Sequence, residues 1–163
     1  MNWLNKNLDS RRVFVNTLNE LNDERIVVVI PDIGFNYLDD PENKFKVVNV
    51  GITESFGMIY AANLALEGWK VFFYTMVNFA LFRPYEMVRN AVVCHNAPVT
   101  IIGVSGSGNY NMLGFSHNLL HPEEDFKLCE NIGLKHHQPQ SNDEVRDVIL
   151  NAYRENEARY IRL

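Results

Sequence analysis

The chain has 163 residues, of which 47% are hydrophobic and 21% charged, and its formal net charge at pH 7 is −5. This composition predicts one globular domain, residues 1–163, with a full hydrophobic core. The negative charge argues against nucleic acid or an anionic membrane as the main partner. No apolar run is long enough to span a bilayer, and the first six residues lack the apolar core of a signal peptide. We therefore expect a cytoplasmic protein.

Short apolar runs alternate with helical patterns along the chain. The strands that we expect cover residues 25–30, 47–50, 71–74, 99–104, 134–136 and 160–163. The expected helices cover residues 10–22, 53–67, 85–94, 123–130 and 142–154, and Ser141 is a good capping residue for the last of them. This alternation predicts an α/β fold with a three-layer arrangement, in which a parallel sheet carries helices on both faces.

Two loops are long for a compact domain. They cover residues 32–46 and 106–123, and they follow the strands predicted at residues 25–30 and 99–104. Ligands of α/β sheets bind at the carboxyl ends of the strands, and long loops there are usually functional or disordered. These loops are therefore candidates for a ligand site.

Cysteine and histidine spacing gives no metal site. Cys94 and Cys129 lie far apart in sequence, so we expect two reduced, buried thiols. His136 and His137 are adjacent, without a third ligand at metal spacing, and we assign them no function.

Glu54 stands at the start of the helix predicted at residues 53–67. This helix is apolar on all sides, so we expect it to be buried rather than amphipathic, and Gly68 should end it. Burial disfavours a charged carboxylate, whereas the positive end of a helix favours it, and a group in that position can share a proton with a bound base. Acids are also common in first turns simply because of the helix dipole.

Four segments together resemble one family. Residues 48–55 (VNVGITES), with 61–68 (AANLALEG) behind them, resemble the stretch of transketolases and deoxyxylulose phosphate synthases that carries the glutamate facing the aminopyrimidine of thiamine diphosphate. Residues 75–90 (TMVNFALFRPYEMVRN) follow the family's pyrimidine-side segment without a gap. Residues 114–117 (GFSH) stand at its Gly-x-Thr-His turn, and residues 159–163 (RYIRL) look like its closing strand. The resemblance runs from about Ser10 to the end and implies a transketolase pyrimidine-binding domain, one of the three that members usually have.

The resemblance implies roles for four cofactor-side residues. Glu54 matches the catalytic glutamate that hydrogen-bonds the pyrimidine ring and activates the cofactor. Phe79 matches an aromatic residue that packs against that ring, with a plain core phenylalanine as the alternative. Met76 stands where the family often has a second phenylalanine, and a thioether can still cover a ring. Asp32 resembles an aspartate near the cofactor, but it could equally cap its own turn.

On the substrate side, the resemblance implies that His117 is catalytic. The family histidine at this turn faces sugar hydroxyls, and a histidine there could also move protons. The alternative is a surface histidine in a loop. Arg11 matches an arginine that contacts sugar phosphate, although Arg11 and Arg12 could simply form a solvated pair.

The chain departs from the family at two sugar-reading positions. Asn111, Met112 and Leu113 stand where transketolases usually carry Gly-Glu-Asp, and residues 105–108 (SGSG) replace the end of a strand that carries a histidine in the family. Leu113 cannot form the hydrogen bond of the missing aspartate, and an unpaired sugar hydroxyl costs about 1 to 3 kcal/mol. The substrate therefore need not be an ordinary pentose phosphate.

The chain also lacks the Gly-Asp-Gly motif, followed at a distance by Asn, through which these enzymes hold the diphosphate and Mg²⁺. The resemblance therefore implies the pyrimidine-binding subunit of a split enzyme. A separate diphosphate-binding subunit would hold Mg²⁺ in an α2β2 assembly, and the pair would transfer a two-carbon ketol unit between sugars or sugar derivatives. The alternatives are a subunit of a thiamine-dependent carboligase or 2-oxo acid decarboxylase, and a non-catalytic scaffold. Exposed apolar surface is expected on the isolated domain.

Overall fold

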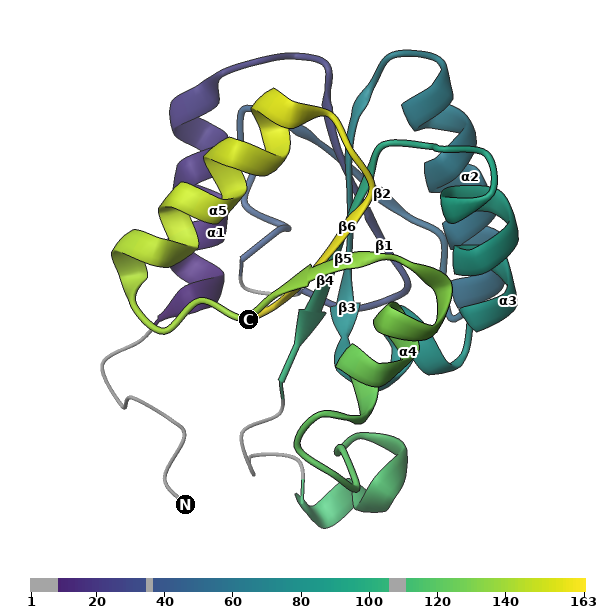
Figure 1. Cartoon of the computed structure of the whole chain (residues 1–163). Coiled ribbons are helices and arrows are strands. Elements are labelled where there is room, and N and C mark those ends of the chain that lie inside the picture. The colour runs from purple at the N-terminus through teal and green to yellow at the C-terminus, as the bar shows by residue number, and fades with distance from the viewer. Residues whose placement is uncertain (1–8, 35–36, 106–110) are drawn as a thin grey trace.

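The computed structural model describes residues 9–34, 37–105 and 111–163 of the chain. In this part, six strands form one parallel sheet in the order β2-β1-β3-β4-β6-β5 (Figure 1). The strands are β1 (Ile26–Ile30), β2 (Lys46–Asn49), β3 (Lys70–Met76), β4 (Val99–Val104), β5 (Lys135–His137) and β6 (Arg159–Arg162). The predicted α/β fold and the six predicted strands are confirmed, with ends that shift by up to two residues.

Helices cover both faces of the sheet, as predicted. The α-helices are α1 (Ser10–Leu21), α2 (Glu54–Leu66), α3 (Tyr85–Met87), α4 (Glu124–Ile132) and α5 (Asn142–Glu155). Helices α1 and α5 pack against each other on one face, while α2, α3 and α4 lie on the other (Figure 1). The Ser141 hydroxyl accepts a hydrogen bond from the Glu144 amide at 3.1 Å, which confirms the predicted cap of α5.

Two hydrophobic cores lie on opposite faces of the sheet. Phe73 of β3 belongs to the core under α2, whereas its neighbours Phe72 and Tyr74 belong to the core under α1 and α5. Side chains alternate across a strand, so a central parallel strand contributes to both cores and reads as a continuous apolar run. Gly103 of β4 leaves the space that the Tyr160 side chain needs, because a Cβ there would lie 2.3 Å from the Tyr160 hydroxyl oxygen.

The segment between β3 and β4 differs from the prediction of one helix at residues 85–94. A π-helical turn, η1 (Asn78–Phe82), begins just after β3, and a second one, η2 (Val88–Val93), follows α3. A π-helix has one more residue per hydrogen-bonded turn than an α-helix, and such bulges are frequent at functional sites. The loop predicted at residues 106–123, of which residues 106–110 lie outside the described part, also contains 3-10 structure, η3 (Asn111–Ser116), interrupted at Gly114.

Two predictions about burial are wrong. Helix α2 is not buried on all sides, because Phe56, Ile59 and Leu66 are 58%, 39% and 53% exposed on its outer face. Apolar composition identifies a surface that favours burial, but nothing in the described part of the chain covers it. Cys94 is exposed, whereas Cys129 is buried as expected, and burial raises the pKa of the Cys129 thiol to about 12.

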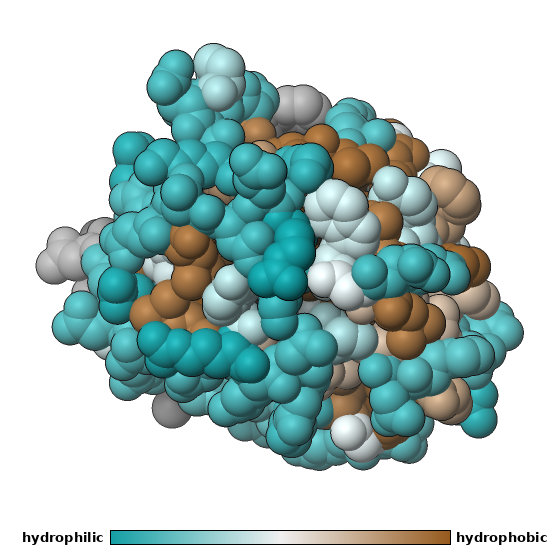
Figure 2. Space-filling model, turned by 90° about the horizontal axis from the view of Figure 1, so that it is seen from above, coloured by the Kyte–Doolittle hydropathy of each residue, from teal (hydrophilic) through white to brown (hydrophobic). Residues whose placement is uncertain are grey.

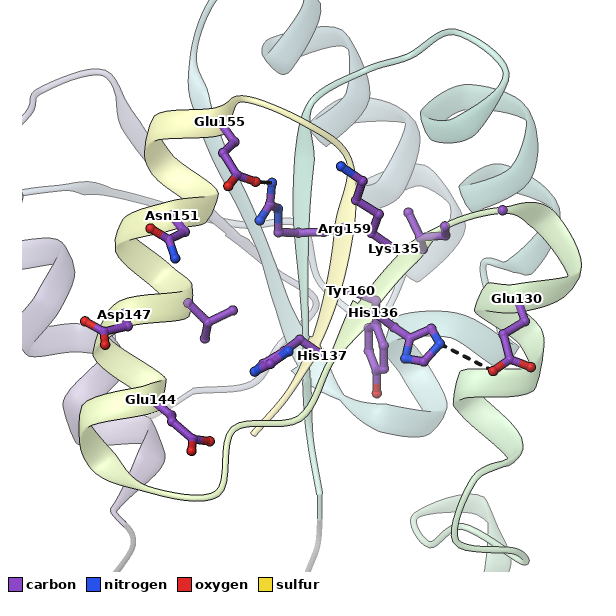
Figure 3. A pocket seen from close by; sticks show the side chains of 13 residues that line it. Glu130, Lys135, His136, His137, Glu144, Asp147, Asn151, Glu155, Arg159 and Tyr160 are labelled. Atoms are coloured by element: carbon purple, nitrogen blue, oxygen red, sulfur yellow. Dashed lines mark hydrogen bonds and ion pairs between the residues drawn. The ribbon is translucent and has the colours of Figure 1, made fainter.

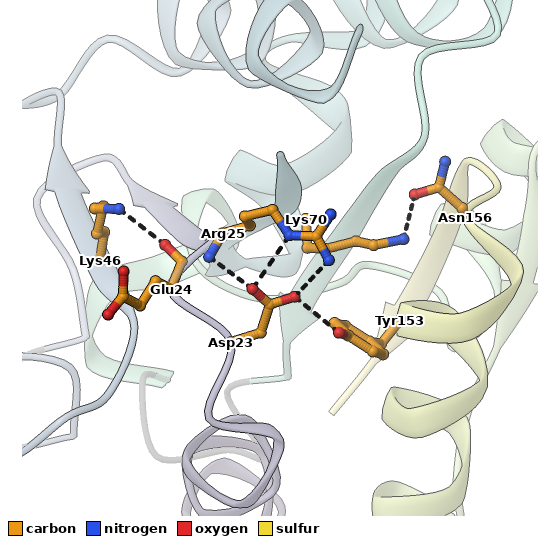
Figure 4. A network of polar contacts seen from close by, with 7 residues as sticks. All are labelled: Asp23, Glu24, Arg25, Lys46, Lys70, Tyr153 and Asn156. Carbon is orange, nitrogen blue, oxygen red and sulfur yellow. Dashed lines mark hydrogen bonds and ion pairs between the residues drawn. The ribbon is translucent and has the colours of Figure 1, made fainter. Parts of the chain in front are cut away.

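A polar network closes the amino end of the sheet around Asp23 (Figure 4). The Asp23 carboxylate accepts hydrogen bonds from the Arg25 backbone amide at 2.9 Å, the Arg25 guanidinium at 3.0 Å and the Tyr153 hydroxyl at 2.8 Å. The bonds from Arg25 hold the pKa of Asp23 well below its usual value of 3.8. Asp23 therefore ties the start of β1 to α5.

Replacing Asp23 by asparagine should lower the free energy of unfolding by about 1 to 2 kcal/mol at pH 7, since hydrogen bonds to a charged group are lost. A pKa that is lower in the folded state gives stability that is present above pH 3.8 and is lost as pH falls further. Urea unfolding of Asp23→Asn and the native chain should therefore converge as pH falls below 3.8. Glu24→Gln, an exposed neighbour, is the control, and a difference that stays constant with pH would contradict this account.

Candidate functional site

The candidate site lies at the carboxyl end of the sheet, where the segments after β1, β2 and β3 come together. Because the strands are parallel neighbours, the turn after β1, the start of α2 and the η1 turn leave from the same edge. Figure 1 shows this edge at the lower end of the molecule, near the C-terminus. Open α/β sheets bind ligands there. Glu54, Phe79 and Asp32 all belong to these segments.

Glu54 opens α2 and is almost completely buried, with 6% of its surface exposed. The chain turns into the helix at Gly51, which has a φ of +70°, and the Thr53 hydroxyl donates to the Val50 carbonyl at 2.7 Å. One carboxylate oxygen, Oε1, accepts a hydrogen bond from Nη1 of Arg83 at 2.5 Å. A buried carboxylate thus stands at the positive end of a helix, paired with an arginine.

Arg83 also covers the aromatic ring of Phe79. Its guanidinium carbon lies 3.9 Å from the ring centroid, which is a cation–π contact. The ring of His117 meets the Phe79 ring edge-on, with 4.9 Å between their centroids. Three predicted site residues, Glu54, Phe79 and His117, are therefore connected in space, and Arg83 is the link between the first two.

Asn78 holds the His117 segment against η1. Its side-chain nitrogen donates to the backbone carbonyls of Phe115 at 3.3 Å and Asn118 at 3.2 Å. The Ser116 hydroxyl is 2.8 Å from Nδ1 of His117, which orients the imidazole. A pocket of about 390 Å³ with a mostly apolar inner surface lies between η1 and this segment. It is lined by Asn78, Phe79, Phe82, Arg83, Phe115, Ser116, Asn118, Leu120 and Glu124.

The two other predicted cofactor residues lie beside this group. Asp32 is exposed, has a φ of +55°, and its carboxylate accepts a hydrogen bond from the Asn49 amide at 3.2 Å. Asn49 also accepts from the backbone amide of Gly51 at 2.9 Å, so the turn after β1 is tied to the approach to Glu54. Met76, at the end of β3, is only 4% exposed, so it has little free surface for a ligand.

Arg83, Asn78 and Asn49 are the site residues that the sequence analysis did not assign. Arg83 and Asn78 lie within the segment that carries the family resemblance, and a charged residue four positions after Phe79 was the available signal. Arg11, for which a phosphate contact was considered, lies with its guanidinium carbon 5.1 Å from the Tyr37 ring centroid. Arg11 therefore makes a cation–π contact with Tyr37.

A buried ion pair stands at the carboxyl end of β6. The Arg162 guanidinium donates to Asp125 at 2.9 Å, to the Pro122 carbonyl at 2.7 Å and to Gln138 at 2.7 Å. Tyr160 donates to the other Asp125 oxygen at 2.8 Å, and its complete burial raises the pKa of the phenol well above its usual value. This network joins β6 to the start of α4, where the segment that carries His117 ends.

A larger groove of about 610 Å³ runs between α5 and the edge strand β5, away from Glu54 (Figure 3). Several of its charged side chains already have partners within the chain. Arg159 pairs with Glu155 at 2.6 Å, Lys135 pairs with Glu157, and the His136 ring lies 3.5 Å from a Glu130 oxygen. We therefore assign the groove no function.

Among residues 9–34, 37–105 and 111–163, no three His, Cys, Asp or Glu side chains come close enough together to hold a metal ion. None of the helices in the described part of the chain has the length and hydrophobicity needed to cross a bilayer.

Comparison with known proteins decides the family. The model of the transketolase pyrimidine-binding domain matches residues 6–163. The chain belongs to this family. The B subunit of apulose-4-phosphate transketolase from Phocaeicola vulgatus is 35% identical over 122 residues, which are 72% of this chain and 39% of the relative. An uncharacterized 33.6 kDa protein in the fasciation locus of Rhodococcoides fascians is 30% identical over 100 residues, 58% of this chain and 31% of that protein.

Solved structures agree with this transketolase-type domain. The split-gene transketolase described as an inactive beta4 tetramer superposes with a TM-score of 0.77 at 25% identity, over 94% of this chain and 50% of that one. Transketolase from Campylobacter jejuni superposes with a TM-score of 0.76 at 16% identity, over 94% of this chain and 25% of that one, and supports the fold alone. The chain thus spans less than half the length of the curated relatives that it matches.

Proposed function

We propose that this chain is the pyrimidine-binding subunit of a split, thiamine diphosphate-dependent transketolase that transfers a two-carbon ketol unit between sugars or sugar derivatives. The observation that carries the proposal is the buried Glu54 carboxylate, at the start of α2 beside the η1 segment, in a chain that the family model matches from residue 6 to residue 163. Two relatives support the split arrangement, because one is named as a subunit of its transketolase and another as the product of a split gene.

The residues at the site fit the pyrimidine half of thiamine diphosphate. Glu54 offers a carboxylate shielded from water, which could hydrogen-bond a ring nitrogen, and Phe79 offers an aromatic surface for the ring. Asp32 would border the same space, whereas Met76, which is 4% exposed, would contribute little surface to it. The bound cofactor would supply a thiazolium carbon that carries the ketol unit. His117, at the edge of Phe79, would face the substrate and hold or move a proton at its imidazole.

A separate diphosphate-binding subunit would complete this site and hold Mg²⁺, since the 163 residues contain no Gly-Asp-Gly motif. An α2β2 assembly would place each site between two chains.

Exposed hydrophobic side chains support an interface with a partner subunit. One group surrounds α2, where Ile52, Phe56 and Leu66 are more than half exposed, and a second surrounds η3, where Met112 and Phe115 are 85% and 79% exposed. Exposed apolar surface of this kind marks interaction sites. At the amino end of the sheet, opposite the candidate site, hydrophilic side chains cover most of the surface and hydrophobic ones appear in separate patches (Figure 2).

The apolar lining near His117 favours a second candidate function, a thiamine-dependent carboligase or 2-oxo acid decarboxylase. Leu113 and Phe115 are exposed there, at and next to the positions where the family has polar sugar readers. A less hydroxylated substrate would suit such a surface. A screen of ketose phosphates against 2-oxo acids as donors distinguishes the two reactions.

Calorimetry with thiamine diphosphate and Mg²⁺ tests the proposed function. Calorimetry should detect no binding of the cofactor to this chain alone, where only the weak contacts of the pyrimidine ring are available, and one site per pair of subunits when the chain is co-expressed with a partner chain that carries Gly-Asp-Gly and a downstream Asn. Absence of binding in the pair would rule out the thiamine-dependent function and leave a scaffold of the same fold.

A further inference from the structure

Arg83 contacts both residues to which we assign the pyrimidine ring. Its Nη1 donates to Oε1 of Glu54 at 2.5 Å, and its guanidinium carbon lies 3.9 Å from the Phe79 ring centroid. The guanidinium is planar and carries N–H groups in that plane. An aminopyrimidine in its imino or ring-protonated form, hydrogen-bonded to Glu54 and stacked near Phe79, would present the same two features, a flat face and a ring N–H directed at the carboxylate.

We propose, on the basis of the function proposed above, that Arg83 fills the pyrimidine position in the uncombined chain and must leave before the cofactor can bind. Arg83 thus acts as an internal competitor. In a subunit that is not bound to its partner, Arg83 keeps the pyrimidine position filled.

The exposure of Glu54 and Arg83 shows which of these two side chains can move. The Glu54 side chain is 7% exposed and fixed at the start of α2, whereas the Arg83 side chain is 45% exposed and follows the short η1 turn. A buried carboxylate without a partner is costly, so Arg83 stabilises Glu54 in the free chain. When a pyrimidine takes over the contact with Glu54, the Arg83 side chain can swing into solvent with little loss of its own solvation.

The π-helical turn explains why Arg83 reaches both groups. The Arg83 amide donates to the Asn78 carbonyl at 3.3 Å, five residues back, so η1 is one residue wider than an α-helical turn. This places the Arg83 side chain over Phe79 and, at the same time, within reach of Glu54. The same turn carries Asn78, which holds the His117 segment.

The test uses the pyrimidine half of thiamine, 4-amino-5-hydroxymethyl-2-methylpyrimidine, as the probe. It is titrated into the ¹⁵N-labelled full chain and followed by NMR, so no turnover is needed. Removing the competitor raises the fraction of sites open to the probe, and we expect Arg83→Met to bind it about 5- to 10-fold more tightly than the native chain. Arg89→Met is the matched control, because Arg89 is exposed and its guanidinium donates to the neighbouring Asn90 side chain rather than to Glu54.

A measurement on the native chain covers the case in which Arg83→Met does not fold. The Arg83 guanidinium should show contacts to the Phe79 ring in the free chain and lose them as the probe is added. Equal affinities, or Arg83–Phe79 contacts that persist at saturation, would overturn the competitor role while leaving the pyrimidine site intact. No binding to any variant would overturn both this inference and the proposed cofactor site.

Discussion

Replacing Glu54 by glutamine should reduce turnover of the reconstituted enzyme by about 10²- to 10⁴-fold, the range typical for loss of a positioned acid–base group. Glutamine keeps the shape of the side chain but cannot exchange a proton with the ring nitrogen. Glu54 is buried and is the only carboxylate within α2, so no other acid of this helix can replace it. The measurement is steady-state turnover of the subunit pair at saturating thiamine diphosphate and Mg²⁺.

Two controls separate catalysis from folding in this experiment. Glu67→Gln changes an exposed carboxylate at the other end of α2 and should leave turnover unchanged. Arg83 would lose a charged partner in Glu54→Gln, so urea unfolding of the free variant shows whether the site still folds. Turnover within about threefold of the native pair would show that Glu54 does not activate the cofactor.

The sequence predicted the layers and strands of this domain well. The buried strands β1, β3 and β4 are continuous apolar runs, and a run that is buried on both faces has few alternatives to a central parallel strand. The helix that carries Glu54 could be placed because Gly68, with a φ of +90°, ends it sharply. Roles of Glu54, Phe79 and His117 came from resemblance, and the structure connects these residues in space.

The pairing of Glu54 with Arg83 could not be predicted in the same way. It depends on the π-helical turn η1, and apolar periodicity of 3.6 residues does not reveal an extra residue in a turn. Exposure of Phe56 and Cys94 was also missed, because hydrophobicity says which surfaces favour burial and not which chain will bury them. The Glu54–Arg83 pair and the exposure of these side chains both depend on how the helices pack, which local sequence patterns do not encode.

Breaking the buried pair of Asp125 and Arg162 should cost the fold about 3 to 5 kcal/mol, since either single change leaves an uncompensated charge or donor in the interior. Asp125 is fully buried and Arg162 is 4% exposed, so water cannot replace the lost partner. We expect this loss in the free energy of unfolding, measured in urea, for Asp125→Leu and for Arg162→Met. The double variant Asp125→Leu with Arg162→Met should lose less than the sum of the two, because both charges are removed together.

The same pair should also affect the site, because Arg162 donates to the Pro122 carbonyl as well as to Asp125. Pro122 ends the segment that carries His117, so Arg162→Met should loosen that segment. The expected result is faster hydrogen exchange at the backbone amides of the segment. Asp125→Leu, which retains Arg162, should increase this exchange less. Tyr160→Phe, which removes one hydrogen bond to Asp125 and no charge, is the matched mild variant. Single variants within about 1 kcal/mol of the native chain would mean that the interior tolerates these charges, and Asn78 would then be the main contact that holds the segment.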